Sequence, residues 1–360
     1  MGHASTVDCI DELTLPQKAG QLLIVGYKGT QPEDEGVQAV IDDIRASRVG
    51  GVIAFGRNVE SVAQVTALNT ALAEAATLSG LPPLIRAIDQ EGGSVQRLKA
   101  KHGFTEIPNA KEVATGSVDA ARGMYTDLAA RLRGAGFNWN FGPCADLDLA
   151  GEKGLAIGKY GRSYGPDVST VELYAGAMVD GLQAGGCLSC VKHYPGHGSA
   201  VGDTHRGFVN VTEVWQEEEL VPFYSLAPRA GAVMTAHVFN KKLDPENPAT
   251  LSPTILGQLR AHCPDVVIVS DCMQMDALQA ACTSLENGVV RALNAGVDQI
   301  VFANNPMKPG ASCTAGFESG PDFAARFVST VVGAVEAGTL TEALINEKLQ
   351  RVMALKAPTD

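Results

Sequence analysis

Short apolar runs alternate along this chain with longer segments in which apolar residues recur every three or four positions. Continuous short runs are typical of buried parallel strands, and the longer period is typical of amphipathic helices. Eight predicted strands lie at residues 21–27, 50–55, 83–89, 138–144, 187–193, 232–238, 265–271 and 298–303. Predicted helices lie between them, at residues 59–77, 119–134, 169–184, 213–227, 284–295 and 322–337. Further helix starts are indicated at Ser252-Pro253 and Thr341-Glu342.

Eight strand–helix units predict an α/β fold, and they favour a single closed (β/α)8 barrel of the TIM type over an open sheet. The chain has 360 residues, and barrels of this class reach that length as one unit. No long linker, repeat or low-complexity tract divides the sequence, and the segment 305–320 is predicted to be a loop. We therefore expect one catalytic domain, residues 1–360.

Polar residues gather where the predicted strands end. They are Asp89-Gln90-Glu91, Asp146, Asp148, Lys192-His193, His237, Ser270-Asp271 and Asn304-Asn305. Buried strands tolerate such side chains only at their mouths, where water or a charged partner can satisfy them. Because a barrel carries its chemistry at the carboxyl ends of its strands, this distribution predicts an active site there.

The strongest local signal is the stretch Val191–His205, VKHYPGHGSAVGDTH, which holds three of the chain's seven histidines. It turns from a buried strand into a polar loop with several glycines, as catalytic loops on rigid scaffolds do. Asp203 and His205 are two positions apart, so in an extended segment they lie on one face and can pair. A carboxylate beside an imidazole raises the imidazole pKa and fixes the ring, which suits a proton donor near neutral pH. A solvated surface turn is the alternative interpretation.

A second candidate is Asp271, which emerges from the apolar run VVIVS. It suits a fixed nucleophile, or a carboxylate that stabilises a positive transition state. The alternative is a helix N-cap for a segment beginning near Met273.

Metal and cofactor chemistry is not expected. His193 and His197 have the spacing of a zinc-binding helix, but Pro195-Gly196 between them breaks any helix. No phosphate-binding P-loop and no GxGxxG dinucleotide motif is present. We therefore predict no metal and no organic cofactor.

The charge balance narrows the possible partners. The net charge is −12 with no cluster of Lys and Arg, which argues against nucleic acid and anionic membranes. No apolar run reaches the roughly 18 residues of a membrane span, and residues 1–13 lack the pattern of a secretory signal. Eight cysteines are too few for a disulfide scaffold of this size. These features predict a cytoplasmic protein, as a monomer or weak homodimer.

Several motifs together resemble glycoside hydrolase family 3, and more narrowly its single-domain β-N-acetylglucosaminidase branch. In chain order they are LTLPQKAGQLLIVG (13–26), GGVIAFGRN (50–58), IDQEGGSVQRL (88–98), GRSYG (161–165), KHYPGHG with DTH (192–205), MTAHV (234–238) and SDCMQM (270–275). The resemblance covers nearly the whole chain, and it also implies the (β/α)8 barrel.

The resemblance implies roles for individual residues. Asp271 matches the nucleophile that forms a covalent glycosyl-enzyme, and His205 matches the general acid/base, paired with Asp203 on a mobile loop. The positions that match sugar-binding residues are Asp89, Arg97, Arg162, Lys192 and His193. The implied reaction retains configuration, as in two-step glycosidases, but a His–Asp dyad replaces the usual second carboxylate.

One position departs from the pattern of the family, in which the nucleophile is commonly followed by a second Asp. This chain has Cys272 there, so a neighbouring negative charge is absent. The nucleophile itself is kept, and we expect the substitution to change the pKa of Asp271 or the pocket contacts.

The predicted function is therefore a retaining exo-β-N-acetylglucosaminidase (a β-hexosaminidase) acting on a small carbohydrate, a muropeptide or a chitooligosaccharide, in cell-wall recycling. A phosphorylase with phosphate in place of water is the main alternative, because a neutral imidazole would not repel that anion. A β-glucosidase is less favoured, because glucose-specific relatives generally lack the Asp203–His205 motif. A carbohydrate-binding protein without activity and a metal-dependent hydrolase are the remaining alternatives.

Overall fold

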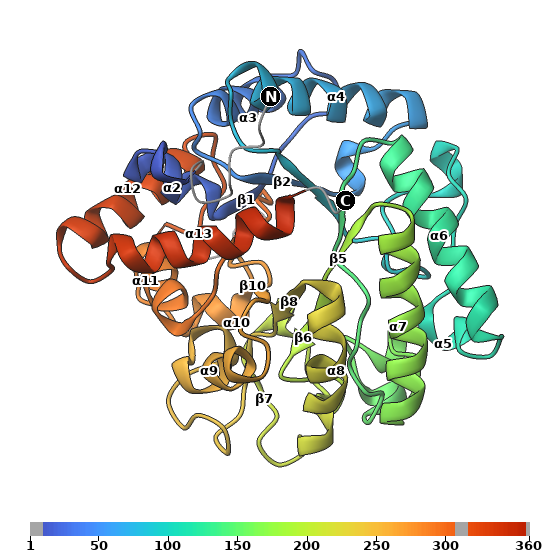
Figure 1. The fold of residues 1–360 in the computed structure, drawn as a ribbon. Helices are drawn as coiled ribbons and strands as arrows, with labels where there is room; N and C mark the ends of the chain where they lie inside the picture. Colours follow the sequence, from blue (N-terminus) through green and yellow to red (C-terminus); the bar gives the residue numbers. More distant parts are fainter. Residues whose placement is uncertain (1–9, 307–315, 358–360) are drawn as a thin grey trace.

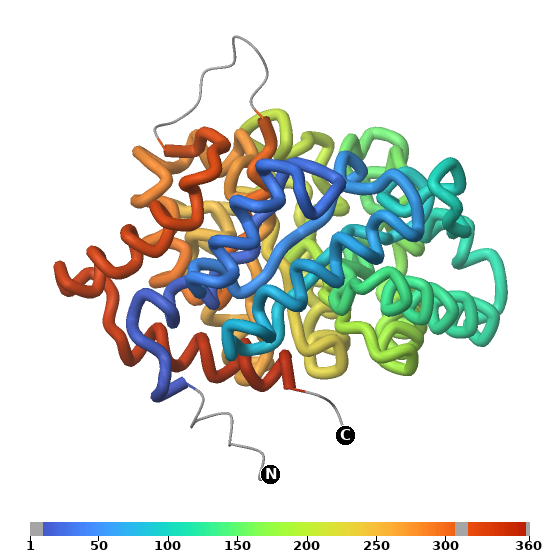
Figure 2. Tube along the Cα trace, turned by 90° about the horizontal axis from the view of Figure 1, so that it is seen from above, coloured from blue at the N-terminus to red at the C-terminus, as the bar shows by residue number. Residues whose placement is uncertain are grey.

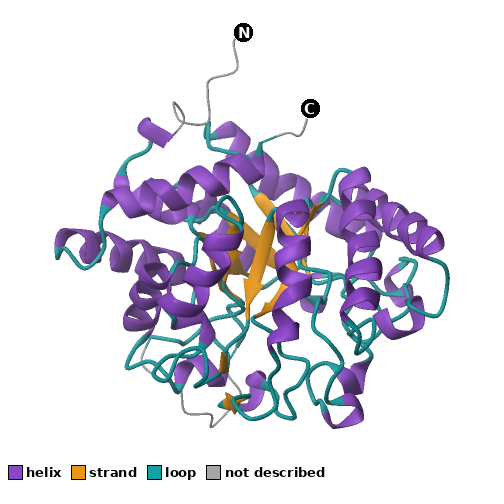
Figure 3. Ribbon diagram, turned by 60° about the horizontal axis from the view of Figure 1, so that its bottom comes forward, coloured by secondary structure: helices purple, strands orange, loops and turns teal. Residues whose placement is uncertain are grey.

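The computed structural model describes residues 10–306 and 316–357, which form an α/β structure of mostly parallel strands surrounded by helices (Figures 1 and 3). The strands are β1 (Leu23–Gly26), β2 (Gly51–Ala54), β3 (Ile85–Ile88), β4 (Trp139–Asn140), β5 (Leu188–Ser189), β6 (Val191–Tyr194), β7 (Val209–Asn210), β8 (Ala232–Thr235), β9 (Val238–Phe239), β10 (Val267–Val269) and β11 (Ile300–Phe302). The helices are α2 (Leu15–Gln21), α3 (Glu35–Arg45), α4 (Val62–Leu78), α5 (Ala110–Val113), α6 (Val118–Gly134), α7 (Val168–Ala184), α8 (Val221–Ala230), α9 (Pro253–His262), α10 (Asp276–Gln279), α11 (Leu285–Ala295), α12 (Phe323–Glu336) and α13 (Glu342–Lys356).

Two parallel sheets carry the fold. One has the strand order β11-β1-β2-β3-β4-β5, and the other has the order β10-β8-β6. Strands β5 and β6 are separated only by Cys190, so the chain passes directly from the edge of one sheet into the other. At the opposite edges, an isolated parallel bridge joins Val269, in β10, to Gln299, just before β11. The predicted α/β class is confirmed, and the closure of these sheets into one barrel stays a prediction.

Alternate residues of each strand enter two separate apolar clusters. Ile24, Ile53 and Ile85 belong to a cluster formed mainly by the strands, together with Trp139 and Met234. Residues such as Val25 and Val52 belong instead to a larger cluster that the strands share with the surrounding helices. Each fully buried side chain of this size contributes roughly 1.5–3 kcal/mol relative to an exposed one. Because strand side chains alternate between faces, burial on both faces requires the continuous apolar runs of the sequence.

The ends of the described chain lie side by side. Helix α2 lies beside α12 and α13 (Figure 2), and the Nζ atom of Lys18 is 2.8 Å from Oε1 of Glu342. The last helices therefore complete the same helical layer that the first one begins.

All eight predicted strand runs contain a strand, but the strands are shorter than predicted. The run 138–144 keeps only Trp139–Asn140 in regular pairing, since Pro143 has no N–H to donate to a ladder. The predicted helix 213–227 is also wrong in its bounds. Residues Glu217–Leu220 form a 3-10 turn, and α8 begins only at Val221, where Pro222 suits the first helical turn. The starts after Ser252 and Thr341 are confirmed, since both side chains cap their helices.

No helix among residues 10–306 and 316–357 combines the length and the apolar character that crossing a bilayer requires. The cytoplasmic location and the monomeric or weakly dimeric state stay predictions. The described cysteines, which include Cys187 and Cys190, are free thiols, and Cys9 and Cys313 lie outside the described residues.

Candidate active site

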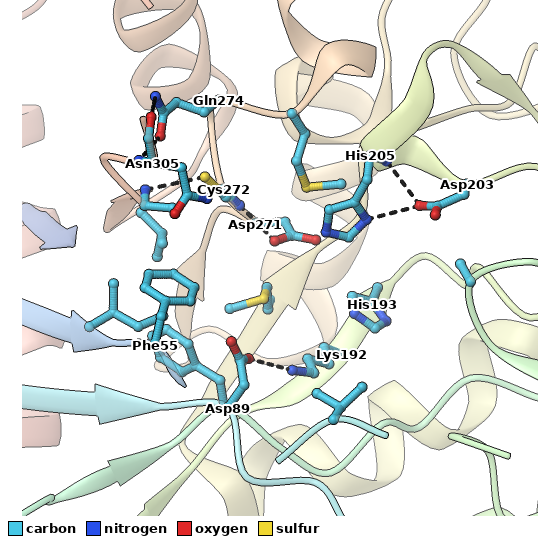
Figure 4. Close-up of a pocket in the computed structure, with 18 of the residues that line it drawn as sticks. Phe55, Asp89, Lys192, His193, Asp203, His205, Asp271, Cys272, Gln274 and Asn305 are labelled. Carbon is cyan, nitrogen blue, oxygen red and sulfur yellow. Dashed lines mark hydrogen bonds and ion pairs between the residues drawn. The ribbon is translucent and has the colours of Figure 1, made fainter. Parts of the chain in front are cut away.

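A pocket of about 580 Å³ opens at the carboxyl ends of the strands. All eight predicted site residues line it: Asp89, Arg97, Arg162, Lys192, His193, Asp203, His205 and Asp271. They come from segments that span more than half of the chain, and Figure 4 shows the central ones facing a shared space. The tertiary structure thus brings together the complete set of residues that the sequence singled out.

The floor of the pocket is a continuous row of charged side chains. Lys192, on β6, places Nζ 2.9 Å from Oδ1 of Asp89 and 2.6 Å from Oε1 of Glu91. On one side, Arg97 Nη2 lies 3.1 Å from the other oxygen of Asp89. On the other side, Arg162 binds both oxygens of Glu91, at 2.9 and 2.8 Å. Each carboxylate is therefore held by two cations, and neither can rotate freely.

The row continues into a buried histidine. His193 Nδ1 lies 2.7 Å from Oδ2 of Asp146, and its Nε2 lies 3.2 Å from Nη2 of Arg162. Since a carboxylate only accepts, Nδ1 carries the proton, and Nε2 accepts from the guanidinium. Asp146 is in turn fixed by the backbone N–H groups of His193 and His197. The imidazole is thus locked in one tautomer and one orientation.

The ion pairs shift the pKa values of this row strongly. Burial raises the pKa of Asp89, but Lys192 and Arg97 more than offset it and bring the value to about 2. Burial also raises the pKa of Asp146, but the contacts with His193 outweigh this effect and lower the pKa to about 2. The pKa of Glu91 is likewise held well below its ordinary range, by Arg162 and Lys192. These acids are ionised at any physiological pH.

Acid should therefore weaken the fold. A carboxylate with a depressed folded-state pKa stabilises the protein above its unfolded-state pKa, and this contribution is lost as the pH falls through the folded-state value. For Asp89 and Asp146 we expect a loss of about 2 kcal/mol each between roughly pH 5 and pH 2. Urea unfolding at a series of pH values measures it. The exposed variant Asp276→Asn should follow the wild-type curve, and a free energy of unfolding that stays flat over this range would contradict the assignment.

His205 and Asp203 form the predicted pair at the rim of the pocket. His205 Nδ1 lies 2.9 Å from Oδ1 of Asp203, and the same oxygen accepts the backbone N–H of His205 at 3.0 Å. Partial burial raises the pKa of Asp203, but these two hydrogen bonds outweigh it and lower the value overall. The carboxylate fixes the proton on Nδ1, so Nε2 is the ring nitrogen that can accept or release a proton. The imidazole side chain is 65% exposed, which lets it reach an entering molecule.

Asp271 faces this pair across the pocket, with the ring of His205 pointing toward its carboxylate (Figure 4). Burial raises the pKa of Asp271, but His237, His193 and His205 together keep it below the ordinary value. The carboxylate accepts the N–H of Cys272 at 2.6 Å, and none of the described residues forms an ion pair with it. The alternative role as a helix N-cap is wrong, because α10 begins only at Asp276, after Met275.

Glu91, Asp146 and His237 were predicted only as polar residues at the strand ends and were not among the eight residues with an assigned role. The ion pairs of Glu91 and Asp146 show that they hold Lys192, Arg162 and His193 in place. His237 donates from Nε2 to the carbonyl of Cys272 at 3.0 Å, which fixes the backbone just after Asp271. Burial lowers the pKa of His237, so this ring is neutral.

Comparison with known proteins shows to which family the chain belongs. A family model described as the glycosyl hydrolase family 3 N terminal domain matches residues 14–355. The chain belongs to glycosyl hydrolase family 3. It is therefore a glycoside hydrolase.

Relatives and solved structures agree with this placement. The β-hexosaminidase LpqI of Mycobacterium tuberculosis is 30% identical over 351 residues, which cover 95% of this chain and 82% of that protein. The β-hexosaminidase of Chromobacterium violaceum is 35% identical over 280 residues, which cover 74% of this chain and 75% of that protein. A family 3 β-N-acetylglucosaminidase structure from Paenibacillus is 34% identical with a TM-score of 0.84, covering 96% of this chain and 62% of that one.

Cys272, beside Asp271, stands where the sequence resemblance implies a second Asp. Its thiol lines the pocket and accepts the backbone N–H of Ala303 at 3.2 Å. Burial raises the pKa of this thiol to about 12, so the side chain is neutral. Asp271 consequently has no negatively charged neighbour at the next position.

Restoring a carboxylate should move the pH profile. In the variant Cys272→Asp, a second negative charge beside Asp271 raises the pKa of the Asp271 carboxyl group, so the acid limb of kcat/KM moves to higher pH. We expect the maximal rate to change less than this limb. Cys272→Asn, which is polar and neutral, is the matched control. Superimposable pH profiles for Cys272→Asp and the wild type would contradict the interpretation that a charge at position 272 shifts the pKa of Asp271.

Proposed function

We propose that this chain is a retaining exo-β-N-acetylglucosaminidase that releases GlcNAc from muropeptides or chitooligosaccharides. The observation that carries the proposal is the His205–Asp203 pair facing Asp271 across one pocket. The names of the relatives, β-hexosaminidase and β-N-acetylglucosaminidase, support the substrate class. The buried floor of the pocket admits the end of a sugar chain, which favours exo cleavage.

In the first step, His205 donates a proton from Nε2 to the glycosidic oxygen while an Asp271 oxygen attacks the anomeric carbon. The bond from that carbon to the leaving oxygen breaks, and a covalent glycosyl-aspartate forms. In the second step, His205 takes a proton from water, whose oxygen displaces Asp271 from the same carbon. Two inversions give net retention, and both the enzyme groups and the proton return to their starting states.

Each group suits its assigned step. The depressed pKa of Asp271 keeps the nucleophile ionised, and Asp203 holds His205 in the tautomer that presents Nε2. Asp203 also stabilises the imidazolium that donates the proton. No step calls for a metal or an organic cofactor.

The charged floor binds the sugar. Asp89, Arg97, Arg162, Lys192 and His193 present fixed donors and acceptors toward hydroxyl and amide groups. Because their mutual ion pairs hold them in place, little side-chain freedom is lost when a sugar binds.

The same proposal includes the architecture. We infer that the two sheets close into one (β/α)8 barrel and that the chain is one catalytic domain. The direct passage from β5 to β6 and the bridge from Val269 to Gln299 support closure at the two seams.

Hydrolysis of p-nitrophenyl β-N-acetylglucosaminide, compared with the β-glucoside, tests the function. Each substrate is assayed with and without phosphate. Strong turnover of the first substrate alone, unaffected by phosphate, is the expected result. Equal or better turnover of the glucoside would overturn the predicted selectivity. Acceleration by phosphate, with a sugar 1-phosphate as product, would make the chain a phosphorylase.

A further inference from the structure

Three buried side chains with the character of metal ligands meet beneath the sugar-binding floor. They are Cys144, Asp146 and His193, whose ligand atoms all lie within 4.8 Å of one another. This is the one such group among the residues that the structure describes. Their exposed fractions are 2%, 0% and 6%, so the group is shielded from bulk water. His193 is the member of the group that lines the pocket, next to Lys192 (Figure 4).

One oxygen of Asp146 is the centre of the group. Oδ2 lies 3.2 Å from Cys144 Sγ and 2.7 Å from His193 Nδ1. The other oxygen, Oδ1, accepts the backbone N–H of His197 at 2.8 Å, and this bond anchors the carboxylate. Oδ2 also accepts the backbone N–H of His193 at 3.2 Å. Its two side-chain donors are the thiol and the imidazole, and a cation could replace both of their protons.

We propose that Cys144, Asp146 and His193 form a binding site for a thiophilic divalent cation, Zn²⁺ or Cd²⁺, and that this ion inhibits the enzyme. A thiolate, an imidazole and a carboxylate are the ligands that zinc prefers. At ordinary zinc distances, about 2.3 Å to sulfur and about 2.1 Å to nitrogen or oxygen, tetrahedral ligands stand about 3.3–3.6 Å apart. The present separations are 3.2 and 2.7 Å. Sγ and the ligand nitrogen of His193 lie within 4.8 Å of each other. The ring must therefore move about half an ångström away from Oδ2 and come to about 3.6 Å from Sγ to reach that geometry.

The inhibition follows from the protons of Cys144 and His193, which must leave or move when the ion binds. Bonds form from the ion to Sγ, Oδ2 and Nδ1, the S–H bond of Cys144 breaks, and its proton leaves to solvent. The proton on Nδ1 of His193 moves to Nε2, which now accepts from Arg162 at 3.2 Å. Two donors would then face each other, so the contact between His193 and Arg162 must open. Since Arg162 also holds Glu91, the ion disturbs the floor on which the sugar rests.

Cobalt binding tests the site without any turnover. The chelator-washed full chain is titrated with Co²⁺, and the near-ultraviolet charge-transfer band of a cobalt–thiolate bond is recorded. We expect a band that saturates at one equivalent, is abolished by excess Zn²⁺, and disappears in Cys144→Val. Cys272→Ser, which removes the thiol that lines the pocket, is the matched control and should keep the band. No band in the unmodified chain would overturn the proposal, and so would a band that survives in Cys144→Val.

The inhibition is then measured on the substrate that the chain turns over, which rests on the proposed function. Zn²⁺ should inhibit the wild type, and a chelator should restore activity. In Cys144→Val, whose activity is normalised to its own metal-free rate, the inhibitory concentration should rise at least tenfold. Inhibition that is equally strong in this variant would place the ion at another group and overturn the assignment. Because the cobalt band needs no catalysis, an inactive chain would refute the proposed function and leave this site testable.

Discussion

Asp271→Ala is expected to lose at least roughly 10³-fold in kcat/KM on p-nitrophenyl β-N-acetylglucosaminide. The carboxylate is the group that forms the proposed covalent intermediate, and no neighbouring carboxylate stands at position 272 to replace it. Its removal leaves the sugar-binding floor intact, so KM should change far less than kcat. Steady-state kinetics, together with a thermal unfolding curve that shows a folded variant, measures the effect.

A small anion distinguishes a nucleophile from a merely structural aspartate. In Asp271→Ala, azide can enter the space of the missing carboxylate and attack the anomeric carbon once, giving the α-glycosyl azide. Asp276→Asn is the matched control, because this exposed carboxylate lines the same pocket at the start of α10. It should keep nearly the wild-type rate. Near-wild-type turnover in Asp271→Ala would show that the nucleophile is another group.

His205→Ala carries the second large expected effect, a loss of about 10²–10⁴-fold on a substrate with a sugar leaving group. Such a leaving group departs as an alkoxide unless it is protonated. Nitrophenolate is stable without a proton, so the first step on the nitrophenyl substrate should be much less affected. The comparison of kcat/KM for the nitrophenyl substrate and a GlcNAc disaccharide measures this difference.

The second step gives an independent signature of the same residue. Once the glycosyl-aspartate has formed in His205→Ala, azide needs no base to attack it, and it should restore turnover with the β-glycosyl azide as product. The two variants thus predict opposite anomers. His262→Ala, which removes an exposed histidine stacked on Tyr224, is the control and should behave as the wild type. Equal losses on both substrates, without azide rescue, would contradict the role in proton transfer.

Asp203 acts through His205 in this scheme. Its carboxylate holds the proton on Nδ1 and accepts the backbone N–H of the same residue. The lowered pKa of Asp203 keeps it charged over the working pH range. It positions the imidazole and stabilises its charged form, whereas His205 is the group that touches the substrate.

The sequence by itself determined the strands and the residues at their ends. Buried parallel strands must be apolar on both faces, so a run such as VVIVS before Asp271 is visible without any partner strand. Parallel strands also share one carboxyl edge, and for this reason polar residues as distant as Asp89 and Asp271 could be assigned to one site. The pairing of Asp203 with His205 was also predicted, but its geometry differs from the expected extended segment. Asp203 caps the 3-10 turn Thr204–Arg206, and the two side chains meet across that turn.

The tertiary structure determined which residues far apart in the sequence interact, and the local sequence pattern does not contain this information. Glu91 acquires its role only because Arg162, 71 positions away, and Lys192 converge on it. Asp146 becomes the support of His193 across 47 positions. The exact strand and helix bounds likewise depended on which backbone groups found partners, as at Pro143 and Val221. Hydrophobic periodicity is a property of neighbours in sequence, whereas charge pairing and burial belong to groups that meet only when the strands are side by side.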